Sequence, residues 1–224
     1  MQASRESLPP SPDRASDLDD DFSSGLSADH WVPHYLPHWT TPDRSAACYR
    51  LTSDGIELRI EQDQLDWRPE DAPLRVSNLQ TGSFSGPVGS ERGTHRHRDD
   101  GLVVRTEHLS PADSGEICLF AIDADAVGPT TTARSGIKAH RDPRLTTDMI
   151  EVTVPLDVSH PHTWTAIWGD DETTIGCDGH VVRRMPQAPD YPLFLMIDLF
   201  EIGGPSGSYP KPAAIHGVRG WSGR

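Results

Sequence analysis

Residues 163–183 have the sequence TWTAIWGDDETTIGCDGHVVR, and this stretch carries the clearest structural signal in the chain. Short runs of β-branched and aromatic residues alternate in it with two turn sequences, Gly169-Asp170-Asp171 and Asp178-Gly179. An Asp-Gly pair readily adopts the positive φ angles of a tight hairpin turn. We therefore predict three consecutive antiparallel strands, over residues 163–168, 173–177 and 180–183.

The same pattern continues on both sides of this stretch. Alternating or β-branched runs predict strands at 55–60, 102–104 and 150–154, whereas no segment keeps a helical period. Residues 193–200 are almost continuously apolar apart from Asp198, which predicts a fully buried strand. Many short strands separated by Pro- and Gly-rich turns predict an all-β sandwich or jelly roll.

Composition narrows the classes of partner. The 224 residues carry 20 Lys and Arg against 34 Asp and Glu, a net charge of −14, so we expect no nucleic-acid partner. No apolar run reaches 18 residues, so we expect no membrane span. Residues 1–20 are rich in Ser, Pro and Asp and predict a disordered acidic tail before a single domain over 21–224. The chain has only three cysteines, which argues against a disulfide framework, and its first residues lack the apolar stretch of a secretory signal. Both features predict a cytoplasmic protein.

The stretch SGEICLFAIDAD, at 114–125, places acids within an apolar strand. In a regular strand Glu116, Cys118 and Phe120 would share one face, whereas a bulge after Cys118 would turn Ala121 and Asp123 onto the face of Glu116. A buried acid is costly unless it lines a wet cleft. The alternative is that Glu116 sits at a solvated strand end.

Several segments together resemble glycoside hydrolase family 16, the concanavalin A-like jelly rolls that include laminarinases and lichenases. The resemblance runs from about residue 20 to about residue 202 and is carried by 31–40, 74–82, 84–89, 114–118, 140–145, 162–179 and 190–198. It implies a retaining glycosidase fold with the motif Glu-x-Asp and a second Glu four or five positions after the first. Glu116 would then be the nucleophile.

The chain departs from this motif at the residues that matter for hydrolysis. Cys118 stands at the middle position, and Phe120 and Ala121 stand where the family has its acid/base. Losing general acid/base help typically costs about 10²–10⁴-fold in rate. Among possible replacements we rank His140 first, since the resemblance places it near Glu116 and imidazole titrates near neutrality. The acids Asp123 and Asp198 are the others.

The chain is also shorter than the family pattern. Only residues 106–114 separate the strand at 102–104 from Gly115, where the family has two further strands. We therefore expect a jelly roll that has lost about two strands. The exposed edge that this leaves predicts a possible homodimer.

Other residues are candidates for binding a small molecule or sugar. Trp31, His34, Tyr35 and Trp39 could form an aromatic lip over the cleft, although simple packing is the alternative. Asn78 and Gln80 could bond ligand hydroxyls, and Cys118 and Phe120 would lie beside Glu116. We expect no metal at His30, His34 and His38, because Pro33 and Pro37 prevent the helix that would align them, and we expect no cofactor.

Three functions remain open. The first is an intracellular enzyme on this scaffold that performs non-glycosidase chemistry on a small molecule, such as isomerisation, cyclisation or dehydration, possibly in secondary metabolism. The second is an atypical retaining β-glycoside hydrolase. The third is a non-catalytic carbohydrate-binding protein.

Overall fold

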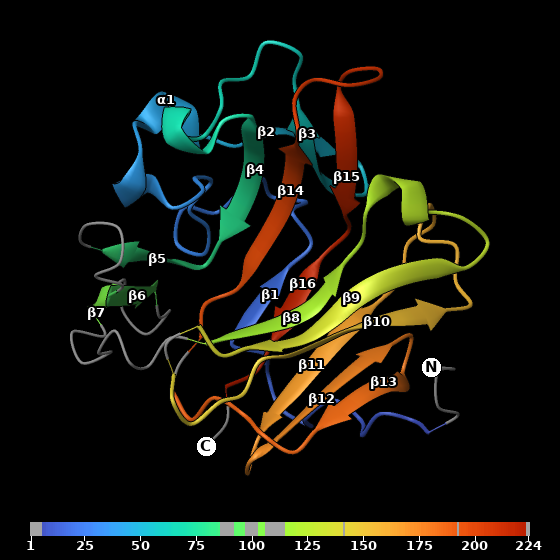
Figure 1. The fold of residues 1–224 in the computed structure, drawn as a ribbon. Helices are drawn as coiled ribbons and strands as arrows, with labels where there is room; N and C mark the ends of the chain where they lie inside the picture. Colours follow the sequence, from blue (N-terminus) through green and yellow to red (C-terminus); the bar gives the residue numbers. More distant parts are fainter. Residues whose placement is uncertain are drawn as a thin grey trace. The chain divides into compact units, whose positions relative to one another are not determined.

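The computed structural model describes residues 6–85, 92–96, 103–105, 115–140, 142–191 and 193–222, and within 83–105 it describes the backbone alone. The chain forms two compact units (Figure 1). The first unit comprises residues 1–13 and 110–192, and the second comprises 14–109 and 193–222. Each is described by itself.

The first unit is built from two three-stranded antiparallel sheets (Figure 1). One has the order β10-β9-β8, with β8 at Glu116–Ala121, β9 at Thr131–Lys138 and β10 at Asp148–Val154. The other has the order β11-β12-β13, with β11 at Trp164–Gly169, β12 at Glu172–Cys177 and β13 at His180–Met185. A short 3₁₀ helix, η3, spans Ala124–Ala126.

The core of the first unit lies between these sheets. Its buried centre consists of Ile137, Leu145, Ile175 and Met185, against which Ile117 and Ala139 pack. Alternation along each strand sends these apolar residues inward and leaves polar ones outside. The hairpins predicted from 163–183 form as expected, with Asp178-Gly179 as the tight turn.

A buried arginine joins the two sheets. Arg183 of β13 is 8% exposed and donates to the backbone carbonyls of Ser135 (2.6 Å) and Asp148 (2.8 Å), and it also pairs with the Asp148 carboxylate. Gly136, between these partners, has φ +148°, and a Cβ there would collide with the Asp148 carbonyl and the guanidinium. This position therefore requires glycine.

The second unit contains the remaining strands (Figure 1). Its sheets have the orders β1-β16, β14-β4, β15-β3-β2 and β5-β6-β7. The strands are β1 Leu18–Asp20, β2 Cys48–Thr52, β3 Gly55–Ile60, β4 Leu74–Gln80, β5 Gly82–Ser85, β6 Arg92–Arg96, β7 Val103–Arg105, β14 Met196–Ile202, β15 Lys211–Ile215 and β16 Val218–Gly220. Three short helices join them: η1 Pro37–Trp39, α1 Pro42–Ser45 and η2 Pro69–Asp71.

Two structural features organise the second unit. Its main core contains Phe22, Trp31, Ile56, Leu58 and Leu79. Near the surface, the buried carboxylate of Glu201 accepts hydrogen bonds from Lys211 and from the Tyr209 hydroxyl (2.7 Å). Burial alone would raise the pKa of Glu201, but these donors outweigh it and hold the pKa below its ordinary value.

The prediction of an all-β sandwich is confirmed, whereas two finer expectations were wrong. The tail is not disordered throughout, because β1 pairs with β16 in the register Leu18↔Gly220. The strand expected at 193–200 begins later and is only half-buried, since one face of β14 leaves Phe200 41% and Ile202 78% exposed. A paired strand with one open face alternates rather than being buried throughout.

Some expectations are not tested. The predicted loss of two strands falls on residues 106–114, which lie outside the described residues. The single domain over 21–224 stays a prediction. Within the described ranges, no helix combines the length and the apolar character needed to cross a membrane.

The arginine that joins the sheets gives a first test. We expect Arg183→Met to lower the free energy of unfolding by about 3–5 kcal/mol, because buried carbonyls lose their donor and the packing does not replace it. Denaturant titration measures this change. Arg184→Met is the matched control, since the exposed Arg184 side chain pairs with Glu6 and Glu172 and donates to the Thr174 hydroxyl, and its loss should change stability much less. An equal loss in both variants would contradict the role of Arg183.

Candidate functional site

Strand β8 contains a bulge that decides which side chains share a face. Glu116 pairs with Lys138 and Cys118 with Gly136, but Ala121 pairs with Arg134, so β8 has one residue more than β9 over this span. The irregularity lies between Cys118 and Ala121, where the sequence had suggested it. Glu116, Cys118 and Ala121 therefore share the outer face of the sheet.

Glu116 is held by two basic side chains. Its Oε1 accepts a hydrogen bond from Lys138 Nζ at 2.8 Å, and its Oε2 lies 3.1 Å from His140 Nε2. Glu116 is the first residue of β8, and its side chain is 41% exposed. It is thus a partly solvated strand-end acid with specific partners, which combines the two alternatives that the sequence left open.

The electrostatics of this group favour full ionisation. Burial alone would raise the pKa of Glu116, but the hydrogen bonds and charges of His140 and Lys138 outweigh it, so the pKa lies below its ordinary value. Burial would likewise lower the pKa of Lys138, but Glu116 outweighs that effect and raises it. At neutral pH the pair is a carboxylate and an ammonium.

The backbone turns sharply to present His140. Strand β9 ends at Lys138, and His140 has φ +44°, in the left-handed region that residues other than glycine seldom adopt. This conformation directs the ring towards Glu116 in the structure. Residues with strained backbone conformations, such as His140 beside the ionised Glu116, are often found in functional sites.

A second ion pair lies on the same sheet. Arg134 donates to the Asp123 carboxylate at 2.9 Å, and both side chains are well exposed. Arg134 is opposite Ala121, four residues along β9 from Lys138, a distance of roughly 13 Å. The structure therefore pairs Asp123 with Arg134 rather than with Glu116, and the acid/base role predicted for Asp123 gains no support.

The bulge also separates Cys118 and Phe120. Cys118 stays on the face of Glu116, and its thiol lies 3.8 Å from the Arg134 carbonyl. Phe120 turns away and stacks on Trp164 of β11, with ring centroids 4.5 Å apart. The expected position of Phe120 beside Glu116 was wrong, since it followed from a regular strand.

The second unit contains the other polar residues predicted to bind ligand. Asn78 and Asp198 are register partners on β4 and β14, and the Asn78 amide donates to the Asp198 carboxylate at 2.6 Å. Asn78 and Gln80 are fully buried, so neither is presented to a ligand in this conformation. Neither side-chain polar atom of Gln80 has a hydrogen-bond partner among the described residues.

The expected aromatic lip mostly serves packing. Trp31 is 1% exposed, packs on Phe22 and donates to Asp20 at 2.8 Å, so its role in stacking on a ligand is corrected. Tyr35 and Trp39 both contact Trp67. His34 is half-buried with Nδ1 3.0 Å from the Ser45 hydroxyl, and burial lowers its pKa.

Two basic residues of the site were missed in the sequence. Lys138 and Arg134 belong to no recognisable sequence motif, and only the pairing of β9 with β8 shows their role.

A shallow depression of about 400 Å³ lies over the β11–β12 hairpin, lined by Ile167, Trp168, Gly169, Asp170, Glu172 and Thr174. Its lining includes none of the predicted site residues, and Glu172 is already paired with Arg184. We therefore base the site on Glu116, Lys138 and His140.

Comparisons with known proteins bear on the fold. No protein-family model matches the chain, and no curated protein matches it in sequence. A similar solved structure is the GlcNAcα1-4Gal-releasing endo-β-galactosidase from Clostridium perfringens, with a TM-score of 0.72 at 19% identity. The match covers 91% of this chain and 62% of that chain, so this chain spans less than two thirds of that enzyme's length. The likeness shows a shared jelly-roll β-sandwich, and membership of glycoside hydrolase family 16 stays a prediction.

The ion pairs of Glu116 give the second test. We expect Lys138→Met to raise the pKa of Glu116, because it removes one of the two groups that lower it. A carbon-13 NMR titration of the carboxyl group measures the change. Arg134→Met is the control, since Arg134 pairs with Asp123 and should leave Glu116 nearly unchanged.

The same variant should alter stability in acid. A carboxyl group whose pKa is lowered by folding contributes stability above its unfolded pKa and loses it as the pH falls through the folded pKa. Lys138→Met should therefore lose less stability on acidification than the wild type. An unchanged Glu116 titration would show that Lys138 is not its partner in solution.

Proposed function

We propose that the chain is an enzyme on a sugar-active type of β-sandwich in which His140, oriented by Glu116, transfers protons on a small polyhydroxylated molecule. The observation that carries the proposal is the contact of 3.1 Å between Glu116 Oε2 and His140 Nε2. A carboxylate that binds one ring nitrogen orients the imidazole, and the other nitrogen can then exchange a proton with a ligand.

The arrangement fits proton transfer better than two-carboxylate hydrolysis. Retaining glycosidases use two carboxyl groups about 5–5.5 Å apart, one of which must donate a proton. Here Ala121 occupies the outward position that follows Glu116 and Cys118, and Asp123 is bound to Arg134. Glu116 itself is a poor proton donor, since its pKa is lowered.

The reaction class follows from the three groups. His140 removes a proton from a carbon next to a carbonyl, the electron pair of that bond moves to the carbonyl oxygen, and the ammonium of Lys138 stabilises the enolate charge. Where that carbon bears a hydroxyl group, the hydroxyl proton moves to the former carbonyl oxygen, and the imidazolium then returns its proton to the former carbonyl carbon, which gives an isomer of the same composition. Departure of a β-hydroxyl group as water, with a proton from the imidazolium, gives a dehydrated product instead.

One alternative is supported by a specific observation. The bulge places Glu116 and position 121 on one face, as a retaining hydrolase requires, and an ionised Glu116 suits a nucleophile. An atypical hydrolase is therefore our second candidate, and a non-catalytic sugar-binding protein is the third. The cytoplasmic location and the homodimer also remain proposals.

The test is proton exchange into sugars. We expect the wild type, incubated in heavy water with free aldoses, ketoses and uronic acids, to incorporate deuterium next to the carbonyl of one of them. NMR follows the exchange. Glu116→Gln and His140→Gln should each slow it by about 10²–10⁴-fold, the usual contribution of general acid–base catalysis.

Two variants provide matched controls. Glu172→Gln and His160→Gln change the same residue types at exposed positions outside the site and should leave the rate unchanged. Release of reducing ends from β-galactosides or β-glucans that Glu116→Gln abolishes would replace the proposal by the hydrolase. Calorimetric sugar binding without turnover, and unaffected by either site variant, would replace it by the binding protein. The absence of exchange with every sugar would overturn it.

A further inference from the structure

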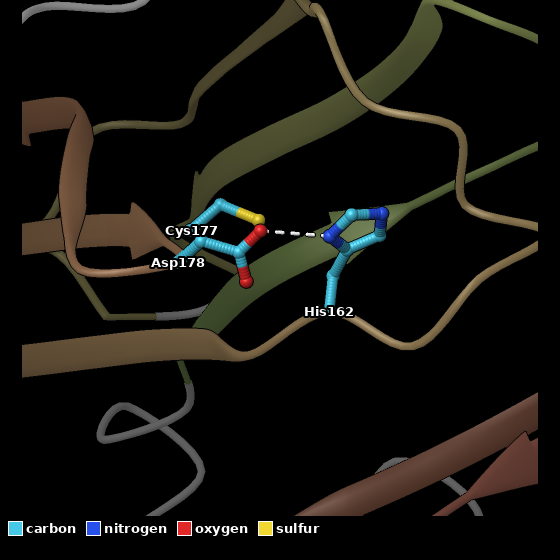
Figure 2. A group of neighbouring side chains, drawn as sticks. All are labelled: His162, Cys177 and Asp178. Carbon is cyan, nitrogen blue, oxygen red and sulfur yellow. Dashed lines mark hydrogen bonds and ion pairs between the residues drawn. The ribbon is translucent and has the colours of Figure 1, made fainter.

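A separate group of side chains lies at the other sheet of the first unit. His162 precedes β11, and Cys177 and Asp178 stand at the end of β12 and in the turn that follows (Figure 2). One nitrogen, one sulfur and one oxygen atom from these residues all lie within 4.8 Å of one another. The shortest separation joins His162 Nδ1 to Asp178 Oδ2 at 2.7 Å. From this geometry we propose that His162, Cys177 and Asp178 form a binding site for a zinc ion.

The histidine is oriented as a metal ligand is. Its Nε2 donates to the backbone carbonyl of Asp157 at 3.0 Å, and its Nδ1 faces the cluster and donates to Asp178 until a metal takes the place of that proton. Histidines that bind metals almost always donate their other ring N–H to a carbonyl or carboxylate in this way. The Asp157 contact thus selects the tautomer that a metal at Nδ1 requires.

The carboxylate is also held in place. Asp178 Oδ1 accepts a hydrogen bond from the Thr163 backbone N–H at 2.9 Å, which leaves Oδ2 directed at His162. The Cys177 sulfur lies within 4.8 Å of a ligand atom of each of the other two residues (Figure 2). Each of the three residues therefore presents one donor atom to a common point.

The dimensions suit a small tetrahedral ion. Zinc bonds to nitrogen and oxygen are about 2.0–2.2 Å, which separates two such ligand atoms by about 3.3 Å in a tetrahedron. His162 and Asp178 would need to open by roughly 0.6 Å from their hydrogen-bonded distance. The Asp178 side chain is 39% exposed and can turn by that amount, and water would supply the fourth ligand.

The donor types select the metal. Sulfur and imidazole nitrogen are ligands of zinc and other borderline transition metals, whereas calcium and magnesium require oxygen. The thiol of Cys177 must release its proton to bind, and burial raises its pKa to about 12. Zinc displaces this proton, so we expect its affinity to increase with pH.

Binding would have a structural consequence. Residues 155–163 connect β10 to β11, and Asp178 belongs to the β12–β13 turn. The metal would replace the direct contact of His162 with Asp178 and would join the loop to both Cys177 and Asp178, beside the hydrogen bond of Thr163 to Asp178. The site is distinct from Glu116 and independent of the proposed function.

Zinc and cobalt titration of the full-length, chelator-treated protein tests the site. We expect one zinc ion to bind per chain and to raise the melting temperature, and cobalt to give a thiolate charge-transfer band. Cys177→Ala should remove the band and weaken zinc binding at least about tenfold, as should Asp178→Asn, which retains the shape of the carboxylate. Cys48→Ala and Cys118→Ala are the matched controls and should bind zinc as the wild type does.

Two results would overturn the site. One is the absence of both the cobalt band and any stabilisation by zinc in the wild type. The other is binding that survives in Cys177→Ala and Asp178→Asn, which would place the metal elsewhere. Melting temperatures of the metal-free variants show whether each has folded, and if Cys177→Ala does not fold, Asp178→Asn alone decides the outcome.

Discussion

The first unit depends on a single buried cation. Arg183 crosses from β13 to the carbonyl groups of Ser135 on β9 and Asp148 on β10, so the space beside residue 136 must stay free of a side chain. This requirement explains the glycine at 136 and its φ of +148°. Gly136 is the register partner of Cys118, and Lys138, two residues further along β9, holds Glu116. Packing between the sheets and chemistry on the surface are thereby linked.

The charges on the outer face of β8 and β9 differ from those around a pair of catalytic carboxylates. Two acids on β8 and just after it have cations from β9 or the turn beyond it: Glu116 has Lys138 and His140, and Asp123 has Arg134. Cations next to an acid keep it ionised, whereas a hydrolytic acid must keep its proton near neutral pH. In the proposed function, this sheet holds charge on a ligand and moves protons through the imidazole of His140.

The parts of the fold that were predictable from sequence are those that depend on neighbouring residues. The Asp178-Gly179 turn and the alternation at 55–60 are local, and both elements formed as expected. The importance of Lys138 could not be seen, because it arises from the register of β8 against β9. The burial of Trp31 likewise depends on Phe22 and Asp20, which approach it only in the folded chain. His140 was found because a family resemblance supplied the missing spatial relation.

The bulge in β8 affects which sequence changes this protein can accept during evolution. It divides the strand into inward residues such as Ile117, which the core needs, and outward residues such as Ala121, which it does not. A substitution at 121 alters the chemistry of the face and leaves the packing intact. Loss of the extra residue would restore a regular alternation in which Glu116 and position 121 still share a face. Loss of a residue from the regular part of the strand would instead exchange the two faces. Point substitution at 121 is therefore a route by which descendants of this scaffold acquire or lose an acid beside Glu116 without disturbing the core.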